Sequence, residues 1–107
     1  MKNGLIEEIT RRWYKNDQLH REDGPAVELA NGDKQWWQNG KLHREDGPAV
    51  EYADGTKCWF INGERHRING PAIEYANGNK YWHFNNKHIG CKTNEEFLRI
   101  VKLKAFL

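Results

Sequence analysis

Apolar and polar residues follow a pattern that recurs along the chain at a fixed spacing. Residues 19–28 recur unchanged as residues 42–51, which is 23 positions later. A third copy, residues 65–74, keeps the register with several substitutions. Tryptophan follows the same period, at Trp13, Trp36, Trp59 and Trp82. Self-similarity at a fixed period indicates a repeat architecture, so the chain contains about three and a half copies of one unit.

Each unit predicts a β-hairpin. Apolar and polar residues alternate over residues 49–53, and more loosely over residues 57–61. Between them, Asp54-Gly55 is a strong two-residue turn signal, because both central residues of such a turn favour positive φ. This turn gives a register that pairs Ala53 with Thr56, Glu51 with Cys58, and Val50 with Trp59.

That register predicts two faces, because side chains alternate across a strand. The expected core face carries Val27, Leu29 and Trp36; then Val50, Tyr52 and Trp59; then Ile73, Tyr75 and Trp82. The opposite face carries Glu28, Gln35 and Trp37; then Glu51, Cys58 and Phe60; then Glu74, Tyr81 and His83. We expect solvent or a partner to contact this second, mixed face.

The last part of the chain predicts an α-helix over residues 92–107. Thr93 and Glu96 have the spacing of a capping box. An apolar stripe follows that includes Phe97, Ile100 and Val101, with Lys104 at its end. We expect the helix to cover the exposed edge of the last repeat, although the width of the stripe alone does not exclude a partner-binding helix.

The predicted fold is mainly β. Antiparallel hairpin repeats stack into an elongated, twisted sheet that is closed by the C-terminal helix. The chain forms one domain over residues 1–107, with an N-terminal strand or cap in 1–12, repeats in 13–91 and the helix in 92–107.

These repeats resemble MORN (membrane occupation and recognition nexus) repeats over about residues 10–90. The resemblance rests on the period of 23, on residues 61–66 (Ile-Asn-Gly-Glu-Arg-His) and on residues 52–57 (Tyr-Ala-Asp-Gly-Thr-Lys). Residues 44–48 depart from the usual Gly-x-Gly, as in the divergent variant of bacterial, phage and large-virus proteins. The resemblance implies stacked hairpins, a scaffolding or protein-binding role with occasional lipid association, and no catalytic residues in the repeat itself.

Composition narrows the functional classes. The chain has 107 residues and a net charge of +2, which is weak evidence for nucleic-acid binding. No apolar run approaches the ~20 residues of a membrane span, and the N-terminus lacks the apolar segment of a secretory signal. The two cysteines, Cys58 and Cys91, are expected as unpaired thiols, because they are few and the expected setting is a reducing cytoplasm. They could pair only if the fold brought them within ~7 Å, which the sequence does not show. We predict a cytoplasmic protein of a bacterium or an infected host cell, with no membrane insertion.

His20, His43 and His66 occupy one repeat position, so a stack arranges them in a row. Successive repeats lie ~9–10 Å apart, which is too far for two of these histidines to share one zinc ion. We predict structural hydrogen-bonding histidines and no metal or other cofactor.

The repeated Arg-Glu-Asp segments have two interpretations. Asp23 and Asp46 precede Gly-Pro and suit turns in which the side chain bonds the local backbone. The arginines Arg21, Arg44 and Arg67 are expected to pair with Glu28, Glu51 and Glu74. The alternative is an arginine row that binds phosphate or carboxylate groups. No asymmetric polar constellation accompanies them, so we predict no enzymatic activity.

Residues that are identical in every copy serve stacking, so a partner is more plausibly recognised by positions that differ between copies. Neighbouring exposed side chains such as Trp37 and Phe60 are typical of a contact surface, unless the helix or the N-terminal strand covers them. The predicted partner-binding residues are Gln35, Trp37, Arg44, Phe60, Arg67, Tyr81 and His83.

The predicted function is a non-enzymatic module that binds another protein of the host or phage. Its specific form is a phage-encoded inhibitor that blocks a host defence component by steric occlusion. The alternative is nucleic-acid or nucleotide binding through an aromatic and arginine-bearing sheet face. The chain is expected as a monomer or as a homo-oligomer formed through a sheet edge.

Overall fold

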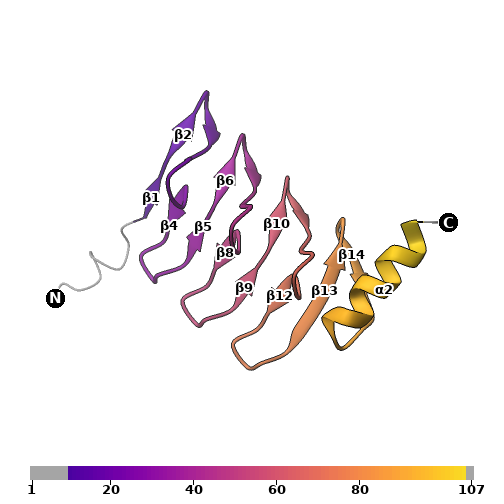
Figure 1. Cartoon of the computed structure of the whole chain (residues 1–107). Helices are drawn as coiled ribbons and strands as arrows, with labels where there is room; N and C mark the ends of the chain where they lie inside the picture. Colours follow the sequence, from indigo (N-terminus) through magenta and orange to yellow (C-terminus); the bar gives the residue numbers. More distant parts are fainter. Residues whose placement is uncertain (1–9, 106–107) are drawn as a thin grey trace.

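The computed structural model describes residues 10–105 of the chain. Residues 1–9 of the expected N-terminal strand or cap, and residues 106–107 of the expected helix, lie outside the described residues. The molecule is elongated, with principal extents of 57 × 35 × 18 Å. Figure 1 shows the repeats side by side along the long axis, with the helix at the C-terminal end.

The described chain is mainly β, as predicted. Its strands are β1 (Arg11–Arg12), β2 (Tyr14–Lys15), β3 (Gln18–Leu19), β4 (Val27–Glu28), β5 (Lys34–Gln35), β6 (Trp37–Gln38), β7 (Lys41–Leu42), β8 (Val50–Glu51), β9 (Lys57–Cys58), β10 (Phe60–Ile61), β11 (Glu64–Arg65), β12 (Ile73–Glu74), β13 (Lys80–Phe84) and β14 (Lys87–Ile89). Eight of them form one antiparallel sheet in the order β1-β4-β5-β8-β9-β12-β13-β14. Three further hairpins, β2–β3, β6–β7 and β10–β11, rise from this sheet (Figure 1).

The turns of the rising hairpins are set by the sequence. Asn39 and Gly40 have φ values of 52° and 77°, which is the pattern of a two-residue turn with both central residues left-handed. The same positions have positive φ in the other copies, at Asn16 and Asp17, Asn62 and Gly63, and Asn85 and Asn86. Asparagine, aspartate and glycine tolerate this conformation, so the turn fixes the register of each rising hairpin.

The predicted two-residue turn at Asp54-Gly55 is wrong. Val50 pairs with Cys58, one position earlier than expected. The Tyr52 amide donates to the Thr56 carbonyl at 2.9 Å, and of the loop residues only Gly55 has a positive φ, at 99°. This is a three-residue loop that ends in a left-handed residue. Because the pairing is shifted by one residue, Val50 shares a face with Cys58 and not, as predicted, with Trp59.

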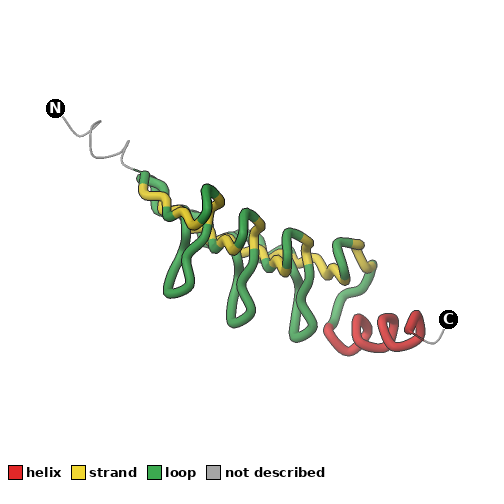
Figure 2. Tube along the Cα trace, turned by 90° about the horizontal axis from the view of Figure 1, so that it is seen from above, coloured by secondary structure: helices red, strands yellow, loops and turns green. Residues whose placement is uncertain are grey.

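The sheet therefore has two faces of different composition. We call the first the aromatic face; its central row is formed by Val27, Gln35, Val50, Cys58, Ile73 and Tyr81, which pair across the strands. We call the second the loop face; it carries Glu28, Lys34, Glu51, Lys57, Glu74 and Lys80. Figure 2 shows three long loops, residues 20–26, 43–49 and 66–72, on the same side of the sheet as the helix. Tyr52 and Tyr75, expected in the core, are each 44% exposed.

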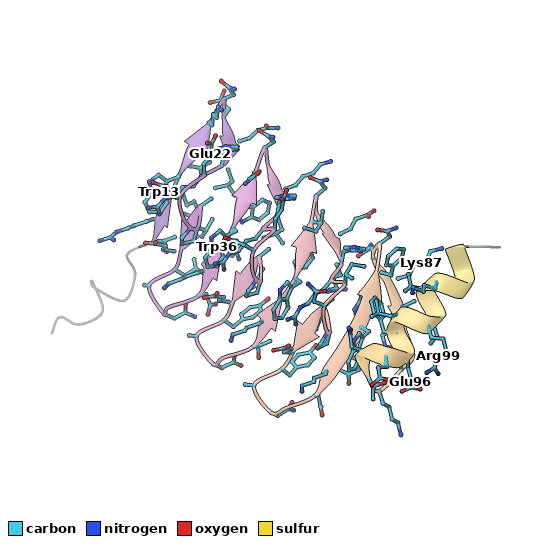
Figure 3. All side chains as sticks on the ribbon, viewed as in Figure 1. Trp13, Glu22, Trp36, Lys87, Glu96 and Arg99 are labelled. Atoms are coloured by element: carbon cyan, nitrogen blue, oxygen red, sulfur yellow. The ribbon has the colours of Figure 1, made fainter. Side chains whose placement is uncertain are left out.

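Each long loop is held on the sheet by an arginine stacked on a tryptophan. The Cζ atom of Arg44 lies 3.8 Å from the centroid of the Trp36 ring, and its Nη1 donates to the Pro48 carbonyl at 3.1 Å. A Cβ atom on Gly47 would lie 2.9 Å from that Cζ, so a side chain at this position would require the guanidinium to shift. Equivalent stacks join Arg21 to Trp13 and Arg67 to Trp59. Trp13 and Trp36 occupy corresponding places in successive repeats (Figure 3).

The C-terminal helix α2 (Asn94–Ala105) caps the stack. Thr93 Oγ1 accepts a hydrogen bond from the Glu96 amide at 3.2 Å, which is one half of the predicted capping box. Glu96 Oε1 accepts from the Lys92 amide at 3.1 Å, one residue before the Thr93 amide that the full capping box would use. Phe97 is fully buried against Trp82 and Ile89. Ile100 and Val101 pack on the same cluster, so the apolar stripe of α2 covers the last repeat. Across the described residues, no helix has both the length and the apolar character needed to cross a membrane.

Candidate binding surface

The side chains that differ between repeats gather on the aromatic face. Of the seven residues predicted to bind a partner, five lie there: Gln35, Trp37, Phe60, Tyr81 and His83. Within β13, Tyr81 and His83 alternate with Trp82, which points toward the helix cluster. Trp37 donates its ring N–H to Gln35 Oε1 at 2.8 Å, so the two side chains share this face and hold each other in place.

The side chains of Arg44 and Arg67 do not share the face of Trp37 and Phe60, and this part of the prediction is wrong, although the Arg44 amide donates to the Phe60 carbonyl at 3.2 Å. Both arginines lie on the loop face, where Arg44 bonds Glu51 at 3.1 Å and Arg67 bonds Glu74 at 2.8 Å. Their side chains are 23% and 24% exposed. The predicted Arg–Glu pairing is confirmed, and it leaves these guanidinium groups already paired within the fold.

The aspartates of the long loops also differ from expectation. Asp23 Oδ1 accepts from Arg21 Nε at 3.1 Å, and Asp46 Oδ1 accepts from Arg44 Nε at 3.2 Å. These carboxylates therefore hold the stacked arginines, rather than bonding the local backbone as predicted. The aspartates therefore still have a structural role in the long loops, but through an ion pair with arginine.

The predicted row of histidines joins successive repeats. His20, His43 and His66 each accept a hydrogen bond at Nδ1 from the turn amide of the next repeat, all at 3.0 Å. In His43 the other ring nitrogen lies 3.2 Å from Glu45 Oε2. Because a neutral imidazole has one donor and one acceptor, Nε2 carries the proton and donates to Glu45. Among the described residues, no cluster of three or more His, Cys, Asp or Glu could hold a metal ion.

Arg65 is the residue on the aromatic face that sequence analysis missed. It pairs with Phe60 across the rising hairpin, and its Cζ lies 5.8 Å from the Phe60 ring centroid. The same position holds leucine in the first two copies, Leu19 and Leu42. The rule that partner contacts occupy positions that differ between copies would have identified Arg65, had it been applied to this strand.

A pocket of about 290 Å³ lies beside Arg65 on this face. Its lining comprises Tyr52, Asp54, Thr56, Cys58, Arg65, Ile73 and Tyr75. Next to it, Tyr75 and Tyr81 meet edge to face with their centroids 5.8 Å apart, and Tyr81 is 40% exposed. Exposed tyrosine provides large, rigid and amphipathic contact area, which is typical of binding surfaces.

Two titratable groups of this face, His83 and Cys58, have pKa values shifted toward their neutral forms. Burial lowers the pKa of His83, and the positive charges of Arg65 and His88 lower it further. Burial raises the pKa of the Cys58 thiol, and Arg65 opposes that rise. The Nδ1 atom of His83 is buried and has no hydrogen-bond partner, which a charged imidazole would tolerate poorly.

The loop face carries two larger clefts between successive long loops, of about 700 and 600 Å³. The first lies over Trp36 and Arg44, and the second over Trp59 and Arg67. Residues that repeat from copy to copy dominate both linings, including the carboxylates that hold the arginines. These clefts are therefore a consequence of stacking, although Ile61, Ile68 and Asn69 in the second cleft differ from the corresponding residues of the preceding copy.

Comparison with protein-family models, with curated proteins and with solved structures finds no match for this chain.

Proposed function

We propose that this chain is a non-enzymatic module that binds another protein through the aromatic face. One observation carries the proposal: the aromatic side chains that vary between repeats lie together on a face whose tyrosines are exposed, whereas the repeated residues contact one another within the stack. Invariant contacts build the scaffold, and variable contacts are free to determine which partner binds.

A protein partner fits this surface better than a nucleic acid does. Binding to a phosphate backbone depends on several unpaired basic side chains acting together. The arginine row is stacked on tryptophan and paired with glutamate on the opposite face. The aromatic face instead offers rings, a few neutral polar groups and one central arginine, which is the composition of a protein interface core.

The resemblance to MORN repeats also favours a protein-binding or scaffolding role. Inhibition of a host defence component by steric occlusion is the specific form of this proposal. A module 57 Å long can cover an active or assembly surface of a partner without any chemistry of its own.

The proposal is tested by affinity capture from bacterial lysate, with and without nuclease, followed by mass spectrometry. The baits are the wild-type chain, a Trp37→Ala/Phe60→Ala variant and a Lys34→Ala/Lys80→Ala control on the loop face. A stoichiometric protein retained by the wild type and the control, and lost by the aromatic variant, supports the proposal. Equal capture by all three baits, or loss of every captured species after nuclease treatment, contradicts it.

A further inference from the structure

The pocket beside Arg65 joins two neighbouring repeats. Cys58 on β9 and Ile73 on β12 are paired on neighbouring strands and line the pocket together. Arg65 on β11 lines the same pocket. Tyr52 and Tyr75 line it from the hairpin loops of successive repeats. The pocket of about 290 Å³ thus combines one cation, one carboxylate at Asp54, an apolar floor and two aromatic walls.

Arg65 differs in its pairing from the three arginines that recur at one repeat position. Arg21, Arg44 and Arg67 each pair with a glutamate, and each is less than one quarter exposed. Within the described part of the chain, no carboxylate lies within ion-pair distance of the exposed Arg65 side chain. Asp54, which also lines the pocket, accepts a hydrogen bond from the Thr56 amide at 2.8 Å and is engaged in its own loop.

The charges of the strands are separated between the faces. The glutamates of the main sheet, Glu28, Glu51 and Glu74, lie on the loop face with their lysine neighbours. The strand residues with formal charge on the aromatic face are Arg12, opposite Val27, and Arg65. A partner on this face therefore meets positive charge among aromatic rings, and carboxylate is the complementary group.

This inference rests on the proposed function and names the chemistry of the partner. We propose that the pocket receives a carboxylate side chain, Asp or Glu, from an acidic segment of the partner protein, with an adjacent apolar side chain packed against Tyr52 and Tyr75. The planar guanidinium matches a carboxylate through two parallel hydrogen bonds. The rings exclude water around the pair, which strengthens it relative to an exposed ion pair.

Cys58 provides a direct probe of the pocket that needs no partner. The full chain is alkylated with iodoacetate, which is anionic, and separately with iodoacetamide, which is neutral and similar in size. The ratio of the two rates is read at Cys58 and at Cys91 by peptide mass spectrometry. Cys91 is an internal reference, because the charge that acts on its thiol is the carboxylate of Glu96 and not Arg65. We expect Arg65→Gln to lower the iodoacetate-to-iodoacetamide ratio at Cys58 about threefold or more and to leave the ratio at Cys91 unchanged. An unchanged ratio at Cys58 in Arg65→Gln overturns the proposal.

The ligand class is tested by protection of Cys58 from iodoacetamide. Phenylacetate combines a ring with a carboxylate, and phenylacetamide is its neutral counterpart. We expect phenylacetate to slow alkylation of Cys58 at least about threefold more than phenylacetamide at equal concentration, and Arg65→Gln to abolish this preference. Equal effects of the two compounds, or protection by a thymidine oligonucleotide but not by phenylacetate, overturn the proposal; the second result makes the site one for nucleic acid.

Binding of the captured partner separates this inference from the proposed function. We expect Arg65→Gln to weaken the affinity about tenfold, with Arg65→Lys between the variant and the wild type. Because Arg65 is exposed, both variants should retain the wild-type melting temperature. If Arg65→Gln binds as the wild type while Trp37→Ala/Phe60→Ala does not, the carboxylate pocket is refuted and the protein-binding face stands. If neither variant loses affinity, both proposals are refuted.

Discussion

The Nδ1 atom of His43 accepts a hydrogen bond from the backbone amide of Asn62, one repeat further along the chain, at 3.0 Å. His20 and His66 make the same contact with Asn39 and Asn85. Each of these turns is thus tied to the preceding repeat by a histidine, beside a backbone hydrogen bond such as that from the Gly63 amide to the Leu42 carbonyl at 2.8 Å. The contact explains why one histidine position persists through the repeats.

Replacing His43 with phenylalanine keeps a ring of similar shape and removes the acceptor. His43 is buried, so the Asn62 amide would lose its partner in a poorly hydrated site. We expect His43→Phe to lower the free energy of unfolding by about 1–3 kcal/mol. Urea denaturation measures this value, with His88→Phe as the control because His88 is exposed and joins no successive repeats. Equal losses of unfolding free energy in the two variants would contradict a stabilising role for the hydrogen bond between His43 and Asn62.

Gly47 and Arg44 should be coupled energetically. A Cβ atom at position 47 would lie 2.9 Å from the Arg44 Cζ and would displace the guanidinium from Trp36. We expect Gly47→Ala to destabilise the wild-type chain by about 1–3 kcal/mol more than it destabilises an Arg44→Ala chain. A double-mutant cycle by urea denaturation gives the coupling energy. A coupling of zero would show that the contact with Arg44 is not the reason for glycine at position 47.

Phe97 should decide whether α2 stays on the sheet. Its side chain is fully buried against Trp82 and Ile89, and truncation would leave a cavity at the end of the stack. We expect Phe97→Ala to lower the free energy of unfolding by about 3–5 kcal/mol, whereas the neighbouring Leu98→Ala, which is 36% exposed, costs less than about 1 kcal/mol. Similar losses in both variants, measured by thermal and urea unfolding, would contradict the capping role.

His83 should make stability depend on pH. Its pKa is lowered in the folded chain, so the folded state binds fewer protons than the unfolded state over the interval between the two pKa values. The stability that this group contributes is present above the unfolded pKa and is lost as pH falls through the folded pKa. We expect the free energy of unfolding to fall between about pH 7 and about pH 5, and His83→Gln to reduce that slope. An unchanged slope in His83→Gln, measured by urea denaturation across this range, would exclude His83 as the cause.

The repeats, the hairpins and the capping helix could be predicted because they depend on local signals. Asn39-Gly40 demands positive φ at both residues, and Thr93 with Glu96 starts a helix. The register around Asp54-Gly55 could not be predicted, because the same dipeptide closes two-residue and three-residue loops. That single residue of difference placed Tyr52 in the expected core, whereas it lies exposed at the rim of the pocket.

The candidate surface was predicted in part. The comparison between copies selected Trp37, Phe60 and His83 correctly as residues of one face. It assigned Arg44 to the same surface in error. The alternation of residues along a strand does not predict that Arg44 stacks on Trp36, eight positions earlier, on the opposite face. It omitted Arg65. This residue stands out because its side chain has no carboxylate partner among the described residues, and that is visible only once the structure places the glutamates on the opposite face with the other arginines.

The most direct test of the protein-binding face is hydroxyl-radical footprinting of the chain alone and in complex with the captured partner. Oxidation of each aromatic side chain and of Leu98 is quantified by tandem mass spectrometry. We predict that the partner protects Trp37, Phe60, Tyr75 and Tyr81, and leaves Trp13 and Leu98 on the loop side as reactive as in the free chain. Protection of the loop-side residues with no change at Phe60 and Tyr81 would place the partner on the opposite face and contradict the proposed function.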